Sequence, residues 1–494
     1  MTFAALPSPR LRPLDRERTP PGPPPREEPH ASPREHRTSS LALARELWAL
    51  ASPAIAHMFL ITLVFLASRA MVGRYSSAAL ASLQISGTLT WLVYTLFTAF
   101  SSGTLAVVAR SVGAGDRLGA ARAARAALLL AIALGLLVAL PLRIANGSLL
   151  ALLFPHASAA VLADAGAYLH IVLPALPLAF VEAIAAAAFQ GAGDTRTPLY
   201  VATLGNIVNV TLSALLIFGG LGLPELGIRG AAIGTAATMS IEGLLLGALL
   251  LSQRGPLPLG GIAPESLRDR LSLTRLGWGG AALRRVLNVS APTFAEKLVN
   301  QSAYLGFVAM IGLLGPEAMA GNQALVAIEA ICFLTADGFG VAAGATLARK
   351  LGAGKPDEAA RAGWMAAFMA AAWLSTMGLL FALVPRLLMR GFTSDPAIIT
   401  LGARALMVAA IAQPFMAMAT VLGMGLRAAG DTRTVLGVTF LSSMIVRLVA
   451  TYFFAITLGY GLLGIWMGST ADWICRSALL GIAYGRGRWR SAQV

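Results

Sequence analysis

The chain has 494 residues, of which 57% are hydrophobic and only 12% are charged, and its formal net charge is +15. A soluble protein keeps about a quarter of its residues charged to cover its surface, so this composition excludes a soluble globular protein. We expect lipid, not water, to surround most of the chain.

The first 45 residues differ in composition from the rest. They contain the run Thr19-Pro-Pro-Gly-Pro-Pro-Pro-Arg-Glu-Glu-Pro29. Proline-rich, apolar-poor sequence favours an extended, disordered chain, and the segment has no apolar core of a signal peptide. We expect residues 1–45 to be a disordered cytoplasmic tail; a docking role for its prolines is the alternative.

Apolar runs of about 20 residues, the length that crosses a hydrocarbon core, recur along the remainder of the chain. They lie near 47–73, 88–109, 123–142, 161–189, 197–218, 230–251, 286–312, 321–347, 362–384, 398–426, 434–457 and 462–484. The sequence therefore predicts an all-α integral membrane protein with twelve transmembrane helices.

The basic residues are distributed unevenly over the connections between these runs. Beyond the N-terminal tail, alternate connections carry twenty on one side and five on the other. Cytoplasmic loops are enriched in Lys and Arg, so the positive charge indicates topology and not a nucleic-acid partner. We expect a multi-pass protein of the plasma or inner membrane with both termini in the cytoplasm.

The second half of the chain repeats the first. Arg110-Ser-Val-Gly-Ala-Gly aligns with Arg349-Lys-Leu-Gly-Ala-Gly at an offset of 239, and Gly-Asp-Thr-Arg-Thr occurs at 193–197 and again at 430–434. The offset changes by only a few residues over the whole half, as small loop deletions would cause. The sequence therefore predicts a duplication of six helices.

The duplication divides the chain into four predicted parts. They are the tail 1–45, an N-terminal lobe 46–252, a cytoplasmic linker 253–283 and a C-terminal lobe 284–494. Because six is an even number, both lobes enter the membrane in the same orientation. Such repeats are related by an axis along the membrane normal, with the site between them, so we expect a central cleft.

The repeated pentapeptide lies between the fourth and fifth predicted helices of each half. Its glycine can end one helix in a left-handed conformation, its aspartate can cap the next helix, and its arginine can hold the turn on the cytoplasmic side. These residues are Gly193, Asp194 and Arg196 in the first copy and Gly430, Asp431 and Arg433 in the second. We expect paired structural turns, with direct substrate contact as the alternative.

These segments together resemble the multidrug and toxic compound extrusion (MATE) transporters. The likeness rests on the two Gly-Ala-Gly turns, on Gln190-Gly-Ala-Gly-Asp-Thr-Arg-Thr-Pro198 and its second copy, and on Gly205-Asn-Ile-Val-Asn209. It covers about residues 47–490. The resemblance implies two lobes around a central cleft and an outward-directed antiport driven by protons or sodium ions, with no other cofactor.

The chain departs from that family at two positions. Many prokaryotic members carry an aspartate on the first and fifth helices, where this chain has Ser68 and Ser213, while Asn206 and Asn209 remain. A hydroxyl neither titrates near neutral pH nor carries the charge that holds sodium. We therefore predict that these serines do not form a cation site.

Ionisable residues within the bilayer are costly unless they face a cavity or a partner. Glu296, Asn300 and Tyr304 share one face of the seventh helix, and Asp337 lies on the eighth. Burial disfavours the charged form of a carboxylate, so Glu296 and Asp337 are candidates to exchange a proton for a cationic compound. Equally, each carboxylate could form a neutral pair with Lys297 that only holds helices together.

Two further candidates lie in the first half. His57 is the repeat counterpart of Glu296, so we expect the two to face each other, and histidine changes charge near pH 6–7; a packing role is the alternative. Glu182 could line the site or pair with a loop arginine. Asp472 and Arg476 are four residues apart and are expected to neutralise each other.

The sequence favours secondary active export of small, amphipathic or cationic organic compounds by alternating access. A flippase for a lipid-linked precursor is the alternative, and it would need a cleft rich in arginines. A prenyl or glycosyl transferase would need an acidic metal-binding motif such as Asp-Asp-x-x-Asp, which the sequence lacks. We expect a monomeric transporter in contact with membrane lipid, not an enzyme, and no metal site.

Overall fold

The computed structural model describes residues 39–155, 157–252 and 280–492. These described residues are helical with short connections, and they contain no strand. The predicted linker falls largely outside them, as does most of the predicted tail.

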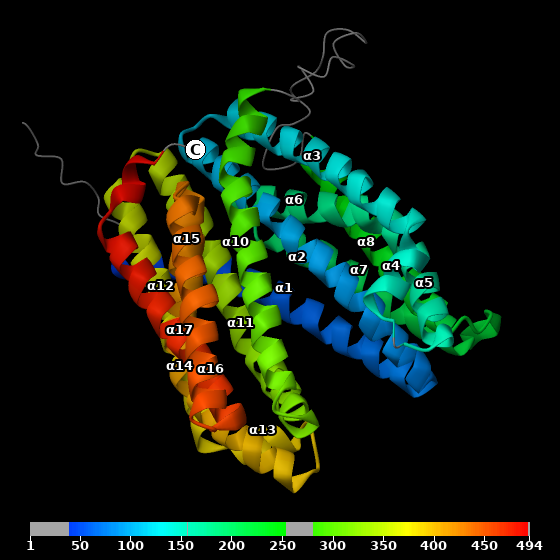
Figure 1. The fold of residues 1–494 in the computed structure, drawn as a ribbon. Coiled ribbons are helices and arrows are strands. Elements are labelled where there is room, and N and C mark those ends of the chain that lie inside the picture. The colour runs from blue at the N-terminus through cyan, green and yellow to red at the C-terminus, as the bar shows by residue number, and fades with distance from the viewer. Residues whose placement is uncertain (1–38, 156, 253–279, 493–494) are drawn as a thin grey trace, which may run out of the picture. The chain divides into compact units, whose positions relative to one another are not determined.

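The N-lobe comprises the helices of the first half of the chain (Figure 1). They are α1 (Ser40–Tyr75), α2 (Ser77–Gly113), α3 (Arg117–Ile144), the short α4 (Asn146–Leu153), α5 (Ala159–Val172), η1 (Leu173–Ala175), α6 (Leu176–Ala192), α7 (Arg196–Phe218), η2 (Gly220–Gly222) and α8 (Ile228–Leu251). The segments α5, η1 and α6 follow one another without a break and form one span, Ala159–Ala192.

The C-lobe comprises the helices of the second half. They are α10 (Ala281–Gly312), α11 (Pro316–Gly352), α12 (Pro356–Leu383), the short α13 (Pro385–Arg390), α14 (Pro396–Ala429), α15 (Thr432–Thr439), η4 (Phe440–Arg447), α16 (Leu448–Tyr452), η5 (Phe453–Thr457), α17 (Gly461–Gly485) and η6 (Arg488–Ser491). The stretch from α15 to η5 is continuous, and η4 and η5 within it are π-helical, a geometry that often marks functional sites.

Ten of the described helical segments are long and apolar enough to cross a membrane. The other two predicted spans correspond to α10 and α17. They have 32 and 25 residues, which is long enough, but they are not apolar enough. Their hydropathy is lowered by the charged residues that they carry, such as Glu296 on α10 and Asp472 on α17. The predicted all-α, twelve-helix membrane architecture is confirmed.

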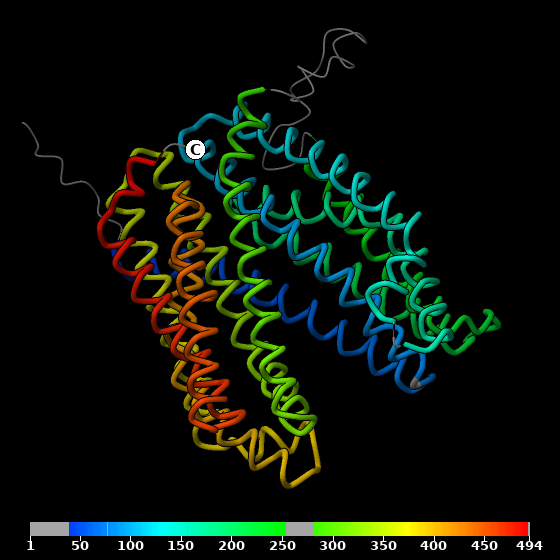
Figure 2. Tube along the Cα trace, in the orientation of Figure 1, coloured from blue at the N-terminus to red at the C-terminus, as the bar shows by residue number. Residues whose placement is uncertain are grey.

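Helix α1 begins earlier than predicted and joins both lobes. Its first residue is Ser40, and the Ser39 hydroxyl caps it by accepting from the backbone of Ala42. Leu43 and Leu47 pack into the core of the C-lobe, which explains why these residues are helical and not part of the tail. Figures 1 and 2 show α1, in dark blue, running from beside α12 to the N-lobe helices.

A small apolar cluster joins the two lobes. It is made largely of alanines from both halves: Ala54, Leu105, Ala109, Ala187, Val341, Ala345, Ala348 and Ala428. Small side chains let helix backbones approach closely, which is how helices associate in lipid. The lobes are therefore in direct contact through α1, α2, α6, α11 and α14.

Candidate substrate and ion site

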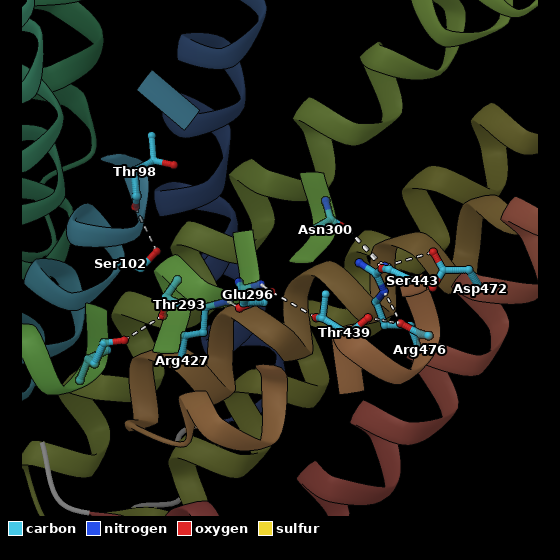
Figure 3. Close-up of polar contacts among 12 residues, drawn as sticks. Thr98, Ser102, Thr293, Glu296, Asn300, Arg427, Thr439, Ser443, Asp472 and Arg476 are labelled. Carbon is cyan, nitrogen blue, oxygen red and sulfur yellow. Dashed lines mark hydrogen bonds and ion pairs between the residues drawn. The ribbon is translucent and has the colours of Figure 1, made fainter. Parts of the chain in front are cut away.

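The Glu296 carboxylate on α10 forms a bidentate ion pair with Arg427 on α14 (Figure 3). Arg427 donates from Nε to Oε2 at 2.9 Å and from Nη2 to Oε1 at 2.7 Å, and the Thr439 hydroxyl donates to Oε1 at 3.3 Å. Glu296 is only 6% exposed. Because a paired guanidinium occupies both oxygens, this carboxylate is held as an ion in the conformation described.

The partner of Glu296 is thus not the adjacent Lys297. Consecutive residues on a helix point in different directions, and Lys297 forms no ion pair among the described residues. Nor does His57 contact this pair. It is buried on α1, which packs against α11 and α7, and no described residue hydrogen-bonds to it. The expected opposition of His57 and Glu296 produces no contact, because Glu296 turns toward α14.

A second buried charge cluster lies between η4 and α17. Asp472 is fully buried and receives Arg447 Nη2 at 2.5 Å and Arg476 Nη2 at 3.1 Å. The guanidinium of Arg476 also lies 4.7 Å from the ring centre of Trp473. The expected pairing of Asp472 with Arg476 is confirmed, and Asp472 is also the partner of Arg447, for which the sequence predicts none.

Asn300 belongs to this second cluster. Its Oδ1 accepts from the Ser443 hydroxyl at 3.3 Å and from Arg476 Nη2 at 3.5 Å (Figure 3). Tyr304, one turn further along α10, stacks on Phe307 with ring centres 6.3 Å apart. The face predicted from Glu296, Asn300 and Tyr304 is therefore real, but two of its three members are bound to C-lobe arginines.

Two of the carboxylates on α11, Asp337 and Glu329, lie away from its exposed first turn and outside these clusters. Asp337 is half-buried and makes no hydrogen bond or ion pair with any described residue, although Lys297 and Arg427 are close enough to act on it electrostatically. Glu329 accepts a hydrogen bond from Gln413 Nε2 at 3.4 Å. Of Glu296, Glu329, Asp337 and Asp472, only Asp337 has no hydrogen-bond or ion-pair partner among the described residues.

The N-lobe holds a pair of carboxylates of a different kind. Glu182 on α6 is 8% exposed and accepts a hydrogen bond from the Tyr94 hydroxyl on α2 at 3.3 Å. Glu242 on α8 is close enough for the two carboxylates to repel each other. Neither forms an ion pair with a basic residue in the part of the chain that the structure describes, so the expected loop arginine beside Glu182 is not found.

Close helix packing brings Glu242 to this place. Gly243 of α8 lies directly against the backbone of Leu178 on α6, and the Glu242 side chain lies across Gly205 of α7. The signal for Glu242 in the sequence is that it is an acid inside a predicted span. Its position beside Glu182 follows only from the packing of α6 and α8.

The two Gly-Asp-Thr-Arg turns differ in their capping. Gly193 and Gly430 both end a helix with positive φ, 95° and 96°, as predicted. Asp194 Oδ1 accepts from the backbone N–H groups of Arg196 and Thr197, both at 3.0 Å.

In the second copy the expected cap is absent. The helix begins one motif position earlier, at Thr432, and the Asp431 side chain caps nothing. Asp431 is the residue directly before its helix, whereas Asp194 is two residues before the helix that begins at Arg196. The two carboxylates therefore differ in position relative to the helix start. Arg196 and Arg433 are both exposed, as residues that face water should be.

Two segments of the chain, residues 53–215 and 292–453, match the model of the MatE family. The chain belongs to the MATE transporter family. It is 30% identical over 455 residues to the probable multidrug resistance protein NorM of Thermotoga maritima, which covers 92% of this chain and 94% of that protein. It is 27% identical over 424 residues to the multidrug resistance protein MdtK of Pectobacterium atrosepticum, covering 84% and 89%.

Solved MATE structures share the fold. The bent form of the Vibrio cholerae MATE transporter VcmN matches with a TM-score of 0.80 at 18% identity, covering 91% of this chain and 98% of that one. A MOP superfamily transporter from Pyrococcus furiosus matches with a TM-score of 0.78 at 20% identity, covering 92% and 98%. At these identities the likeness establishes the two-lobe fold of this MATE transporter.

In this MATE transporter the N-lobe serines lie within a polar face on α1 and α7. The Ser68 hydroxyl donates to Asn209 Oδ1 at 3.4 Å. Ser213 is buried, and its hydroxyl has no partner among the described residues. Asn206 is buried as well. No group of three or more acidic, histidine or cysteine side chains that could hold a metal occurs in the described chain.

Proposed function

We propose that this MATE transporter exports small organic cations by antiport with protons, and that the N-lobe carboxylates Glu182 and Glu242 carry the coupling. The names of the relatives, probable and established multidrug resistance proteins, support export of several organic compounds. Protons are favoured over sodium because one proton is enough to neutralise one of two neighbouring carboxylates, and the Tyr94 hydroxyl already binds the other.

One observation carries the proposal. Glu182 and Glu242 are neighbouring carboxylates within the membrane-spanning helices, and no described basic residue pairs with either. Two carboxylates in low dielectric cannot both stay charged without compensation. The pair therefore takes up a proton or an organic cation, whichever is present.

That competition is sufficient for antiport. An organic cation binds when the pair carries negative charge, and a proton on one carboxylate oxygen removes the charge that attracts the cation. The Tyr94 hydroxyl donates to Glu182 Oε2, so it stabilises the ionised form of Glu182 and leaves Glu242 as the carboxylate that is more easily protonated. Antiport then requires only that the two lobes re-orient when the carboxylate pair carries either the proton or the organic cation.

Asp337 is the second candidate for coupling. It has no hydrogen-bond partner among the described residues, unlike Glu296, whose two oxygens are both bound. A flippase is not favoured, because Arg427, Arg447 and Arg476 each bind a carboxylate and are not available to a lipid phosphate.

The test is gradient-driven transport of a fluorescent organic cation in proteoliposomes, with proton and sodium gradients imposed separately. Glu182→Gln and Glu242→Gln should each lower proton-driven transport by tenfold or more, about 1.4 kcal/mol of barrier. Glu317→Gln is the matched control, because Glu317 is exposed at the start of α11. Wild-type rates in both N-lobe variants, with loss in Asp337→Asn, would move the coupling to the C-lobe.

A further inference from the structure

At one end of the lobes, α2 and α11 cross with their backbones in contact. The Cα of Gly113 lies against the backbone carbonyl of Arg349, and the Cα of Gly352 lies against that of Arg110. A methyl group added to either glycine would overlap the facing carbonyl. The two contacts are one contact repeated by the duplication, since both pairs of equivalent residues are 239 positions apart.

The side chain of Arg110 reaches from the N-lobe into the C-lobe. Its Nη1 donates to the carbonyl of Ala429 at 3.4 Å and to that of Ala492 at 2.7 Å. Ala429 is the last residue of α14 and precedes Gly430 of the second Gly-Asp-Thr-Arg turn. One N-lobe arginine therefore holds both a C-lobe turn and the segment that follows η6.

Arg349 makes the reciprocal contact. Its guanidinium fills the space beside Gly193, in the first Gly-Asp-Thr-Arg turn, where any other residue would place its side chain. Its Nη2 also lies 3.6 Å from Glu46 Oε1 on α1. The arginine at the end of the second helix of each lobe thus reaches the turn of the opposite lobe.

We propose that Arg110 and Arg349 are positioning residues that form a reciprocal latch between the lobes and close this end of the transport pathway. The proposal rests on the proposed transport function only in that alternating access must open the latch once per cycle. It also gives the two Gly-Asp-Thr-Arg turns a shared neighbour, an arginine of the opposite lobe. In the first copy the glycine both supplies a left-handed residue and leaves room for the opposite arginine.

The contacts suit a latch that opens. The adjoining interlobe cluster consists mostly of alanines, which bury little area and separate at low cost. The arginine contacts are few, and the side chain of Arg349 is 23% exposed, so water can replace its partners. Elsewhere the lobes pack extensively, α10 against α2 and α1 against α11, so we assign to the latch only the contacts at this end of the lobes.

The experiment measures opening directly. Ala345 is buried in the interlobe cluster, and a cysteine there, in a full-length chain with Cys332→Ala and Cys475→Ala, reports opening by its rate of reaction with a small, membrane-impermeant maleimide. Arg110→Ala with Arg349→Ala should raise this rate by about tenfold, through the larger open population. Arg117→Ala should leave the rate unchanged, because Arg117 on α3 is exposed and its side chain makes no hydrogen bond or ion pair with a described residue.

Two further measurements separate a latch from a merely structural role. Arg110→Lys with Arg349→Lys keeps the charge and one donor on each side chain, and should return the labelling rate most of the way to that of the wild type. In the chain with both arginines intact, labelling should accelerate when an organic cation and a gradient are supplied. The second measurement needs no latch mutation and shows whether this interface opens during transport, while the lysine variant tests the arginines themselves if the alanine variant does not fold.

An unchanged labelling rate in the folded alanine variant, or wild-type labelling that never rises during transport, would overturn the latch. Labelling without substrate does not depend on which ion or compound is carried. A failure of the latch is therefore distinguishable from a failure of the proposed coupling, which would appear only in the flux measurement.

Discussion

The two lobes share one repeated framework but treat buried charge in opposite ways. In the C-lobe, Glu296 is bound by Arg427. Their repeat counterparts in the N-lobe are His57, at an offset of 239, and Gln190, at an offset of 237. Both counterparts are buried, and neither brings a permanent charge, so an ion pair in one lobe corresponds to two residues without a permanent charge in the other.

The same contrast appears on the last helix of each lobe. Arg476 of α17 corresponds to Glu242 of α8, and Asp472 corresponds to Thr238, both at an offset of 234. The C-lobe therefore carries an arginine where the N-lobe carries a carboxylate. At these equivalent positions, a single helical framework thus carries ion pairs in the C-lobe, and residues without a permanent charge or an unpaired acid in the N-lobe.

The largest effect is expected where a C-lobe charge is removed. Asp472→Asn leaves Arg447 and Arg476 facing each other without compensation in the membrane, and breaking a buried ion pair costs about 3–5 kcal/mol. The folded yield and the melting temperature in detergent should both fall steeply. In the N-lobe, Glu242→Gln removes a repulsion and should leave the melting temperature equal or higher; a fall like that of Asp472→Asn would break the comparison.

The second-largest effect is expected when the Glu296–Arg427 ion pair is replaced by uncharged side chains, as at the equivalent N-lobe positions. Glu296→Gln and Arg427→Gln should each be strongly destabilising, because each leaves one buried charge unpaired. The double variant should recover about 1–3 kcal/mol of the summed loss, the coupling expected for residues in contact. A melting-temperature cycle measures it, and simple additivity would argue that the pair is not coupled.

A smaller effect should separate the two turns. Asp194→Ala removes the cap on α7 and should cost about 1 kcal/mol, because the carboxylate accepts two backbone hydrogen bonds and one from the Thr197 hydroxyl. Asp431→Ala removes no cap and should be close to neutral. The range of transported compounds should not change in either variant, and a changed range with normal yield would point to substrate contact.

The smallest effect is expected at the N-lobe serines. Ser68→Ala with Ser213→Ala should change the free energy of unfolding by less than about 1 kcal/mol and leave the ion dependence of transport unchanged. The reason is that one hydroxyl makes a single long hydrogen bond and the other makes none that the structure describes. Gradient-driven transport in the double variant measures this. Complete loss of coupled transport would place the coupling ion at these serines after all.

The sequence by itself determined the helices, the repeat and the left-handed turn glycines. Each of these follows from local properties: a run of apolar residues long enough to cross lipid, and a glycine that tolerates positive φ. Local sequence is a weaker guide to where a helix begins or ends. Helix α1, for example, begins at Ser40 because Leu43 and Leu47 are covered by the C-lobe. The absent cap at Asp431 likewise depends on where the helix begins.

Only the tertiary structure decided which buried charges are paired. Glu296 and Arg427 are 131 positions apart in the chain, and Tyr94 and Glu182 are 88 apart. The reach of a side chain is a few ångströms, so its partner depends on which helices pack together and how they are rotated. Nothing in the sequence therefore shows that packing places Arg427 on Glu296 and Glu242 beside Glu182.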